Sequence, residues 1–532
     1  MSDRQALLAQ ASAAAAAGRA GEAIDLLEAL LEREPDFAEA HVMLGSLRHA
    51  RGELADARDS YLLAACHRPD WWSPHLQLGL LALDEDRLDD AVPALSKAMD
   101  LGAPGARAQA ALGAACLKMG QVTEAVGWLR KALRSNPDHA PAHSNLGYAL
   151  FKQLEEYEEG AWHIQRAVEL APGDIAAQCN LMMVLQHQNR AAEALAVADR
   201  VLHASPDLTE ARVNRALIRL KHGELAQGWD DYEARRALPG EDRGADMPWP
   251  DWDGTSLEGR AIFLYGEQGL GDEIMFASCI PDVLARARRC VVECRPKLES
   301  LFRRSFPRAR VIPTEAWRHD RELLSQPPDV KIPMGSLPRF LRRRPADFPR
   351  HTGYLRADAA RIAAWDRRLR ALPGRRKVGI SWRGGLSTTR RSVRSIPLAD
   401  WRALLAIPGV DFVSLQYADP SGEIEAFAGE PNVTVHHWPE AIEDYDDTAA
   451  LVSALDLVVS VQTAVVHLAG ALGKPVWALI PHVPEWRYGA TGETMPWYPS
   501  ARLLRQQRPG AWEPVLRRAR DELWTWSAAP SD

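Results

Sequence analysis

A glycine-rich turn followed by an acid is the first place in this sequence where the residue types could do chemistry. Gly269 and Gly271 precede Asp272, shortly after an apolar run that ends at Tyr265. Glycines allow a tight turn at the carboxyl end of a strand, and a carboxylate at the start of the next helix is favoured by the helix dipole. Asp272 is therefore either an ordinary residue of a helix N-terminus or a catalytic acid or base that faces a cleft.

A second junction between a strand and a helix has the features of an anion site. The buried run 457–461 is followed by Thr463, which is expected to begin the next helix. Exposed backbone amides at Thr463–Val465 would suit a diphosphate. His467 lies one turn further along and could donate to a phosphate oxygen or contact the acceptor. The alternative is that His467 is structural, as a histidine inside a helix usually is.

The loop after the strand-like run 377–382 offers a third set of candidates. It combines glycine amides with flexible guanidinium groups, which suit phosphate or a sugar acid. The loop residues are Arg383, Gly384, Gly385, Arg390, Arg391 and Arg394. The predicted catalytic residues are Asp272 and His467, and the predicted donor-binding residues are Gly269, Gly271, Arg383, Gly384, Arg394, Gln416, Gln462, Thr463 and Ala464.

Two α/β lobes are expected to position these residues. From Ala261 onward, strand-like and helix-like segments alternate, which indicates parallel sheets flanked by helices. The series restarts after Arg370, so we expect one lobe over 259–372 and a second over 373–532, with a cleft between them. The predicted lobes are Rossmann-like. The Trp-rich and Pro-rich segment 237–258 is expected to connect them to what precedes.

A repeat fills the first part of the chain. Gly45, Gly79, Gly113 and Gly147 recur every 34 residues, and alanines and prolines recur in the same phase. This is the tetratricopeptide repeat (TPR) pattern, which predicts an all-α superhelix over 1–236 with about six repeats and a further helix pair. Such arrays commonly bind a peptide or protein in a concave groove. An array that serves only dimerisation or domain support is the alternative.

The predicted groove residues lie on the first helix of several repeats. They are polar side chains that could hydrogen-bond a peptide backbone, although Asn145 could equally satisfy a neighbouring turn. The predicted set is His75, Gln109, His143, Asn145 and Asn180.

Composition limits the function further. The 532 residues are 46% hydrophobic and 25% charged with a net charge of −7, which argues against general nucleic-acid binding. The six cysteines show no metal-ligand spacing, and no apolar run reaches the ~18 residues of a membrane span. A cytoplasmic protein without a leader is the expectation. Asp444, Asp446 and Asp447 precede a helix and are expected to cap it, so we expect no metal site.

Three motifs in the second half resemble one enzyme family. The segments are EQGLGDEIMFAS, SWRGG…RRSVRSIPLADW and SVQTAVVHLAGALGKPVWALIPHVPEWRYG…MPWYPSARLLRQ. They resemble the TPR-linked branch of glycosyltransferase family 9, which has the GT-B fold, over nearly all of 240–523. The resemblance implies that Asp272 is the catalytic base and that Thr463, Ala464 and His467 belong to the donor motif D-T-[AG]-x-x-H-x-A. It also implies a basic role for Arg394. Gln462 departs from the family, which usually has Asp there.

The resemblance implies glycosyl transfer with inversion, from a nucleotide sugar and without metal or other cofactor. The first hypothesis is a protein O-glycosyltransferase whose TPR groove presents Ser or Thr hydroxyls, because bacterial flagellin-modifying transferases share this layout. Flagellin is then the candidate acceptor. One alternative is a glycosyltransferase for lipopolysaccharide or polysaccharide. Another is a TPR scaffold with a degenerate transferase domain, which the Gln462 departure favours. A homodimer is compatible with either domain.

Overall fold

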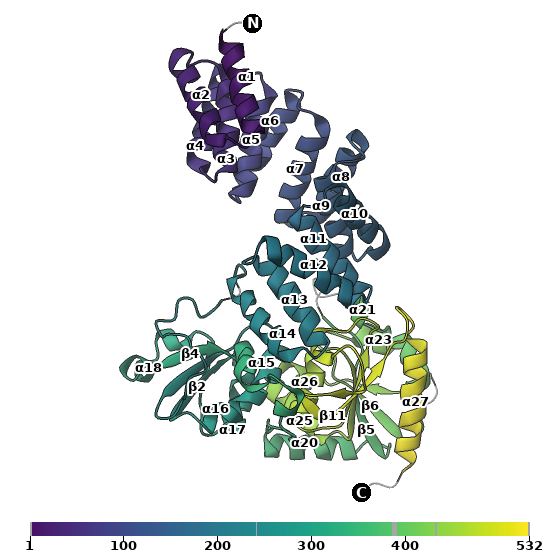
Figure 1. Cartoon of the computed structure of the whole chain (residues 1–532). Helices are drawn as coiled ribbons and strands as arrows, with labels where there is room; N and C mark the ends of the chain where they lie inside the picture. The colour runs from purple at the N-terminus through teal and green to yellow at the C-terminus, as the bar shows by residue number, and fades with distance from the viewer. Residues whose placement is uncertain (1–2, 241, 386–390, 431–432, 530–532) are drawn as a thin grey trace. The chain divides into compact units, whose positions relative to one another are not determined.

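The computed structural model describes residues 3–240, 242–385, 391–430 and 433–529 of the chain. The chain divides into two compact units, Met1–Val184 and Leu185–Asp532. The first unit is all-helical and the second contains two sheets flanked by helices (Figure 1). None of the helices described in either unit is both long enough and apolar enough to cross a membrane.

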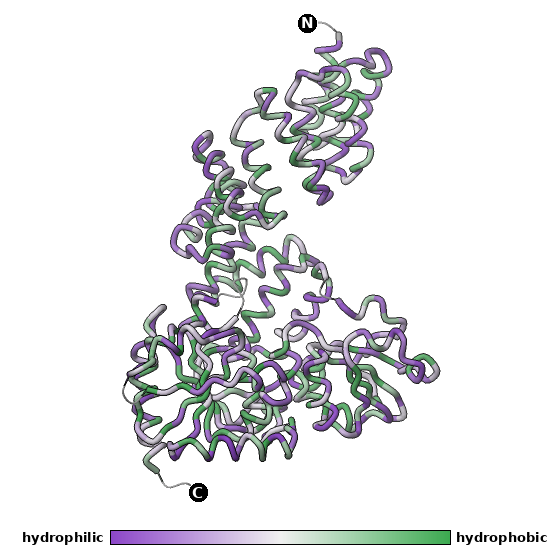
Figure 2. Tube along the Cα trace, turned by 180° about the vertical axis from the view of Figure 1, so that it is seen from behind, coloured by the Kyte–Doolittle hydropathy of each residue, from purple (hydrophilic) through white to green (hydrophobic). Residues whose placement is uncertain are grey.

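Paired antiparallel helices build the first unit, which is the predicted TPR superhelix. The repeat glycines explain how closely the helices pack, because a Cβ atom on Gly45 or Gly113 would lie 2.6 Å from the side chain of Tyr61 or Leu129. Hydrophobic and hydrophilic residues alternate along these helices (Figure 2). The helices are α1 (Asp3–Ala16), α2 (Ala20–Arg33), α3 (Ala38–Ala50), α4 (Leu54–His67), α5 (Trp72–Asp84), α6 (Leu88–Asp100), α7 (Gly105–Lys118), α8 (Val122–Ser135), α9 (Ala140–Tyr148), α10 (Tyr157–Leu170) and α11 (Ile175–His187).

A π-helical turn interrupts the repeat after α9. It spans Ala149–Gln153, and Glu155 follows it with a left-handed φ of 59°. A π-turn inserts an additional residue into a helix, which accounts for the step of 35 residues from Pro137 to Pro172 where the earlier repeats have 34.

The second unit begins with helices that continue the repeat pattern and then forms a parallel sheet. Its strand order is β3-β2-β1-β4, and all neighbouring pairs are parallel. The elements are α12 (Ala191–Ala204), α13 (Thr209–Lys221), α14 (Leu225–Tyr232), η2 (Glu233–Ala237), β1 (Ala261–Tyr265), α15 (Leu270–Phe276), η3 (Ala277–Cys279), α16 (Ile280–Leu284), β2 (Arg289–Cys294), η4 (Pro296–Leu298), α17 (Glu299–Ser305), β3 (Arg310–Pro313), η5 (Ala316–Arg318), α18 (Arg321–Ser325), β4 (Val330–Pro333), η6 (Met334–Ser336), α19 (Pro338–Leu341), η7 (Pro345–Asp347) and α20 (Ala359–Arg370).

The second sheet has the order β10-β11-β9-β8-β5-β6-β7, in which only the β10–β11 pair is antiparallel among the described strands. Its strands β5, β8 and β9 are wholly or almost wholly buried, as expected for a parallel sheet covered on both faces. The elements are β5 (Arg376–Ser381), α21 (Arg391–Arg394), η9 (Leu398–Trp401), α22 (Arg402–Leu405), β6 (Val410–Ser414), α23 (Ser421–Glu425), β7 (Val435–His436), α24 (Glu440–Glu443), α25 (Tyr445–Ala454), β8 (Leu457–Val461), α26 (Ala464–Ala471), β9 (Val476–Ile480), η10 (Trp486–Tyr488), β10 (Thr494–Met495), β11 (Tyr498–Arg505) and α27 (Glu513–Ala528).

The last helix pair, α13 and α14, is anchored within this second unit. The buried Trp229 donates from its indole nitrogen to Arg342 O at 3.0 Å. Arg235 and Glu267 form a buried ion pair of 2.6 Å that joins η2 to the loop after β1. The compact unit that holds both sheets therefore includes these helices, whereas the predicted domain boundary at 236 follows the repeat pattern and stays a prediction.

The connector residues Trp249 and Trp252 pack against the domain of the first sheet. The Trp249 ring lies 4.9 Å from that of Phe263, and the Trp252 ring lies 4.8 Å from that of Phe340. The two parallel-rich sheets agree with the expected α/β class, and the GT-B fold stays a prediction.

Candidate functional site

A pocket of about 550 Å³ opens where helices from the two sheets meet. Both sheets contribute, because α15 follows β1 and α26 follows β8. Helices α15 and α26 pack closely at Gly271, where an added Cβ atom would lie 3.1 Å from Cδ2 of His467. Of the predicted catalytic and donor-binding residues, the pocket is lined by Gly271, Asp272, Arg394, Gln462, Thr463, Ala464 and His467.

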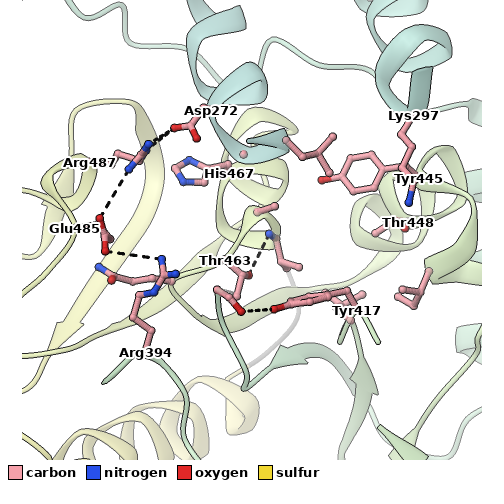
Figure 3. A pocket seen from close by; sticks show the side chains of 18 of the residues that line it. Asp272, Lys297, Arg394, Tyr417, Tyr445, Thr448, Thr463, His467, Glu485 and Arg487 are labelled. Carbon is pink, nitrogen blue, oxygen red and sulfur yellow. Dashed lines mark hydrogen bonds and ion pairs between the residues drawn. The ribbon is translucent and has the colours of Figure 1, made fainter. Parts of the chain in front are cut away.

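Asp272 both stabilises the start of α15 and faces the pocket, so its two predicted roles coexist. Its Oδ2 accepts from the backbone N–H of Gly269 at 3.3 Å, which satisfies an amide at the helix start. Its Oδ1 accepts from Nε of Arg487 at 2.6 Å, and Nη2 of the same arginine also contacts it. Figure 3 shows this pair at the wall of the pocket. The carboxylate is therefore held by Arg487, which lies after β9 of the second sheet.

His467 is buried between two tyrosines. Its Nδ1 lies 3.1 Å from the hydroxyl of Tyr498, and its Nε2 lies 3.4 Å from the hydroxyl of Tyr488. Burial lowers the pKa of His467 to about 4, with Arg487 adding to the shift and Asp272 opposing it. The ring is thus neutral at physiological pH and both nitrogens face hydroxyl groups. Its predicted catalytic role stays a prediction, and the geometry also suits a positioning role.

The junction before α26 carries a side chain whose hydrogen bonds are unmet. Thr463 is the N-cap, because its hydroxyl accepts from the N–H of Val465 at 3.2 Å. The preceding Gln462 is 2% exposed and lines the pocket. Neither its Oε1 nor its Nε2 has a hydrogen-bond partner among the described residues. A buried amide without partners is costly, so this side chain could hydrogen-bond a group that enters the pocket.

Four predicted donor-binding residues do not line the pocket. Gln416 is 1% exposed, and its side chain hydrogen-bonds the loop after β5, accepting from Arg383 N at 2.9 Å. The guanidinium of Arg383 pairs with Glu423 at 3.1 Å. Gly384 supports the loop by close packing, since a Cβ atom there would lie 2.8 Å from Gln462 O. Gly269 is the N-cap residue of α15. Arg390 lies outside the described residues.

Sequence reasoning missed a pair of charged residues on the loop after β9. Arg487 contacts Asp272, and Glu485 lies 4.0 Å from Arg487 and 4.0 Å from Arg394. The motif PHVPEWRYG contains both residues directly after a buried strand. An acidic and a basic side chain close to a strand end could therefore have indicated these two residues. The remaining pocket wall includes Lys297, Tyr417, Tyr445 and other residues, namely Leu270, Gly385, Leu415, Ile442, Thr448, Val465 and Tyr488.

Two predicted groove residues of the array stabilise turns within the repeats. Nε2 of His143 donates to Pro137 O at 2.8 Å, and the ring is 3% exposed. His75 makes the corresponding contact with Pro69 O, although at 3.4 Å. A side chain six residues after the repeat proline therefore fastens the turn between helices. These contacts favour a structural role for both histidines over the predicted peptide contact.

The other predicted groove residues are partly exposed. Gln109 accepts from the Ser135 hydroxyl at 3.2 Å, and Asn180 donates to the Ser144 hydroxyl at 3.0 Å. Asn145 lies on α9, and its side chain makes no hydrogen bond to another described residue. Asn145 and Asn180 stand at matching places of successive repeats, so they stay the better candidates for partner contact.

The acidic run before α25 is engaged in the fold. Asp444 caps the helix by accepting from Asp446 N at 2.9 Å, as predicted. Arg361 contacts Asp444 at 2.6 Å, and Arg304 contacts Asp446 at 2.7 Å. Within the described part of the chain, no three His, Cys, Asp or Glu side chains are grouped as a metal would require. Metal-independent chemistry stays a prediction.

Comparison with known proteins identifies the repeats. Residues 8–71 match the tetratricopeptide repeat family and residues 113–153 match the TPR repeat family. The chain is 34% identical over 339 residues to Protein FlbA of Caulobacter vibrioides (strain ATCC 19089 / CIP 103742 / CB 15), which covers 61% of this chain. The chain spans 56% of the length of FlbA, just over half.

Two solved structures are similar to part of the chain, each with a TM-score below 0.5. PilF of Pseudomonas aeruginosa is 19% identical with a TM-score of 0.35, covering 39% of this chain and 95% of its own. YrrB, described as a TPR protein with an unusual peptide-binding site, is 19% identical with a TM-score of 0.26, covering 35% of this chain and 95% of its own.

Proposed function

We propose that this protein is a GT-B glycosyltransferase that moves a sugar from a nucleotide-sugar donor to Ser or Thr hydroxyls of a protein held by its TPR repeats. The observation that supports this most is the composition of the pocket. Asp272, which follows a strand of the first sheet, lines the same pocket as the N-terminus of α26 and two arginines of the second sheet domain, Arg394 and Arg487. General bases and anion-binding groups are the two requirements for glycosyl transfer from a diphosphate.

Each group has a role in the proposed reaction. Asp272 accepts the proton of the acceptor hydroxyl while the acceptor oxygen bonds to the anomeric carbon. The bond from that carbon to the phosphate oxygen breaks, and its electron pair leaves with the nucleotide diphosphate. The amides at the start of α26, together with Arg394 and Arg487, stabilise the negative charge of the leaving group. Inversion at the anomeric carbon follows from a single displacement.

The acceptor is proposed to be a protein because the chain carries TPR repeats, whose usual role is to bind peptides or proteins. Asn145 and Asn180 are the side chains proposed to contact it. Flagellin is the first acceptor to test, because the layout of this sequence resembles that of flagellin-modifying transferases. The reaction is proposed to take place in the cytoplasm.

A scaffold without catalysis is the second candidate, and one observation favours it. The carboxylate of Asp272 is taken up by Arg487 and by the amide of Gly269. A carboxylate held in this way could be a structural tie between the sheets. In that case replacement of Asp272 would alter stability and leave every cellular sugar in place.

The test compares cells that lack this protein with the same cells complemented by wild type or by Asp272→Asn. Glycopeptide mass spectrometry and sugar analysis of lipopolysaccharide are carried out on each. The proposal predicts protein-linked sugar only with the wild type. A sugar lost from lipopolysaccharide alone would assign a glycolipid acceptor instead. Full restoration of protein glycosylation by Asp272→Asn would contradict the catalytic role.

A further inference from the structure

One arginine stands between two carboxylates at the pocket wall. Nε of Arg487 donates to Asp272 Oδ1 at 2.6 Å, and its Nη1 lies 4.0 Å from Oε2 of Glu485. The side chains of Arg487 and Asp272 are 18% and 14% exposed, so the pair is shielded but is reached by solvent. Figure 3 shows the sequence of contacts from Asp272 through Arg487 and Glu485 to Arg394.

The contacts along this sequence differ in strength. The Arg487–Asp272 contact is a short charge-assisted hydrogen bond. The contacts of Glu485 with Arg394 and with Arg487 are 4.0 Å each, at the limit of an ion pair. Both arginines line the pocket, so an anion that entered it would meet two cations.

The strong contact has a consequence for catalysis. While Arg487 donates to Oδ1, that oxygen has a cationic partner where a general base would receive the proton of an acceptor hydroxyl. The other oxygen already accepts from Gly269 N–H. In this arrangement Asp272 faces the pocket with both carboxylate oxygens engaged.

A diphosphate can replace Asp272 as the partner of Arg487. Guanidinium groups bind phosphate oxygens in a bidentate manner, and a diphosphate carries more negative charge than one carboxylate. The start of α26 also lines the pocket, and the helix dipole favours an anion at this end, although the N–H of Val465 already donates to the Thr463 hydroxyl. Gln462, next to them, adds an amide without a partner among the described residues.

We propose that Arg487 exchanges partners during the reaction. It holds Asp272 before the donor binds and moves to the diphosphate of the donor on binding, which frees Asp272 Oδ1 for the acceptor hydroxyl. Donor binding therefore precedes productive binding of the acceptor. This inference rests on the proposed function, and it assigns Arg487 two tasks: positioning the base and binding the leaving group.

Binding of inorganic pyrophosphate to the full chain tests the exchange without requiring any transfer. Isothermal titration calorimetry at one fixed salt concentration compares wild type, Asp272→Asn, Arg487→Gln and the double variant. Asp272→Asn removes the competing carboxylate and should tighten binding by about fivefold, the scale of a partly exposed ion pair. Arg487→Gln should weaken binding by about tenfold or more. The double variant should bind no more tightly than Arg487→Gln.

The double variant decides between exchange and simple repulsion. If Asp272→Asn tightens pyrophosphate binding equally when Arg487 is already Gln, Asp272 acts only by repelling the anion, and the proposal is wrong. Unchanged affinity in Arg487→Gln would also overturn it. Arg394→Gln is the matched control, because Arg394 contacts Glu485 and not Asp272. It should weaken binding while the gain from Asp272→Asn persists.

Folding and function are separated by two further comparisons. Arg487→Lys keeps the cation and loses the bidentate geometry, so it should bind pyrophosphate with intermediate affinity. Thermal melts of all variants identify any that fail to fold. If the exchange is observed but no sugar transfer is ever detected, the partner exchange stands and the proposed enzymatic function fails.

Discussion

Two junctions between a strand and a helix meet at the pocket, and they differ in how their polar side chains are satisfied. At the junction of β1 and α15, Asp272 accepts from Arg487 and from Gly269 N–H. At the junction of β8 and α26, the amide of Gln462 has no partner within the described residues. Both side chains line the same pocket.

This difference separates two ways of building a ligand site. The first junction is compensated inside the protein, so a ligand must displace an existing partner. The second has no partner for its amide among the residues that the structure describes, and a ligand with donor and acceptor groups would satisfy it. Changes at the first junction should therefore act mainly on catalysis and on the exchange of partners by Arg487. Changes at the second junction should act on ligand affinity and on the stability of the protein without ligand.

Replacing Asp272 with Asn should have the largest effect. Asn can still accept from Gly269 N–H but cannot serve as a general base, so we expect the transfer rate to fall by roughly 10²–10⁴-fold. The rate is measured as nucleotide release in the presence of the acceptor. Asp272→Glu is the control, since it keeps the carboxylate and should retain more activity than Asn. Equal rates in wild type and Asp272→Asn would show that Asp272 is not the general base.

The buried His467, at the second junction, should make the free energy of unfolding depend on pH. The folded protein favours the neutral ring, with a pKa of about 4, whereas an unfolded histidine has a pKa of about 6.5. As the pH falls from 6.5 toward 4, the unfolded state binds the proton first, so stability that is present above 6.5 is lost. The loss attributable to His467 amounts to at most about 3 kcal/mol.

The measurement is denaturant unfolding at pH 7 and pH 4.5. His467→Gln, which does not titrate and can still hydrogen-bond a tyrosine hydroxyl, should lose less stability over this range than wild type. Parallel losses in the two proteins would show that His467 is not held neutral by its surroundings.

Replacing Gln462 with Met should affect stability and ligand affinity in opposite directions. The substitution removes a buried amide that lacks partners, so the empty protein should gain about 1–3 kcal/mol of stability. The same change should weaken binding of the nucleotide sugar, because the ligand loses a partner. Thermal melts with and without the donor provide both readings. A destabilised empty protein would mean that the amide is already satisfied there.

Loss of the helix cap should have the smallest effect. Thr463→Ala removes the hydroxyl that accepts from Val465 N–H and should cost about 1 kcal/mol. Thr463→Ser keeps the hydroxyl and is the control in the same unfolding experiment. A loss in Thr463→Ser as large as that in Thr463→Ala would assign the stability to the methyl group.

Local patterns predicted the elements that carry both junctions. The apolar runs correspond to β1, β5, β8 and β9, because a strand buried on both faces has a continuous apolar sequence. The helical segment that follows the glycine turn is divided into α15, η3 and α16 and is not one continuous helix. Pro281 lies in the first turn of α16, where it has no amide to donate to the preceding turn.

Contacts between distant segments could not be predicted in the same way. Asp272 and Arg487 are 215 residues apart, and no local pattern pairs them. His75 and His143 look like polar groove residues in sequence, yet each binds a proline carbonyl six residues earlier. Gln416 likewise binds its neighbouring loop and not the pocket. The partners of Asp272 and Gln416 are fixed by tertiary packing, whereas the two histidines bind local carbonyls within their own repeats.

The central claim is transfer of a sugar to a protein, and intact-mass spectrometry of the acceptor tests it most directly. Flagellin, or another protein that co-purifies with the full chain, is co-expressed with wild type or with Asp272→Asn in cells that supply the donor. The account predicts a sugar-sized mass increase with the wild type that is absent with Asp272→Asn. An acceptor that binds the chain but has the same unmodified mass in both would contradict the account.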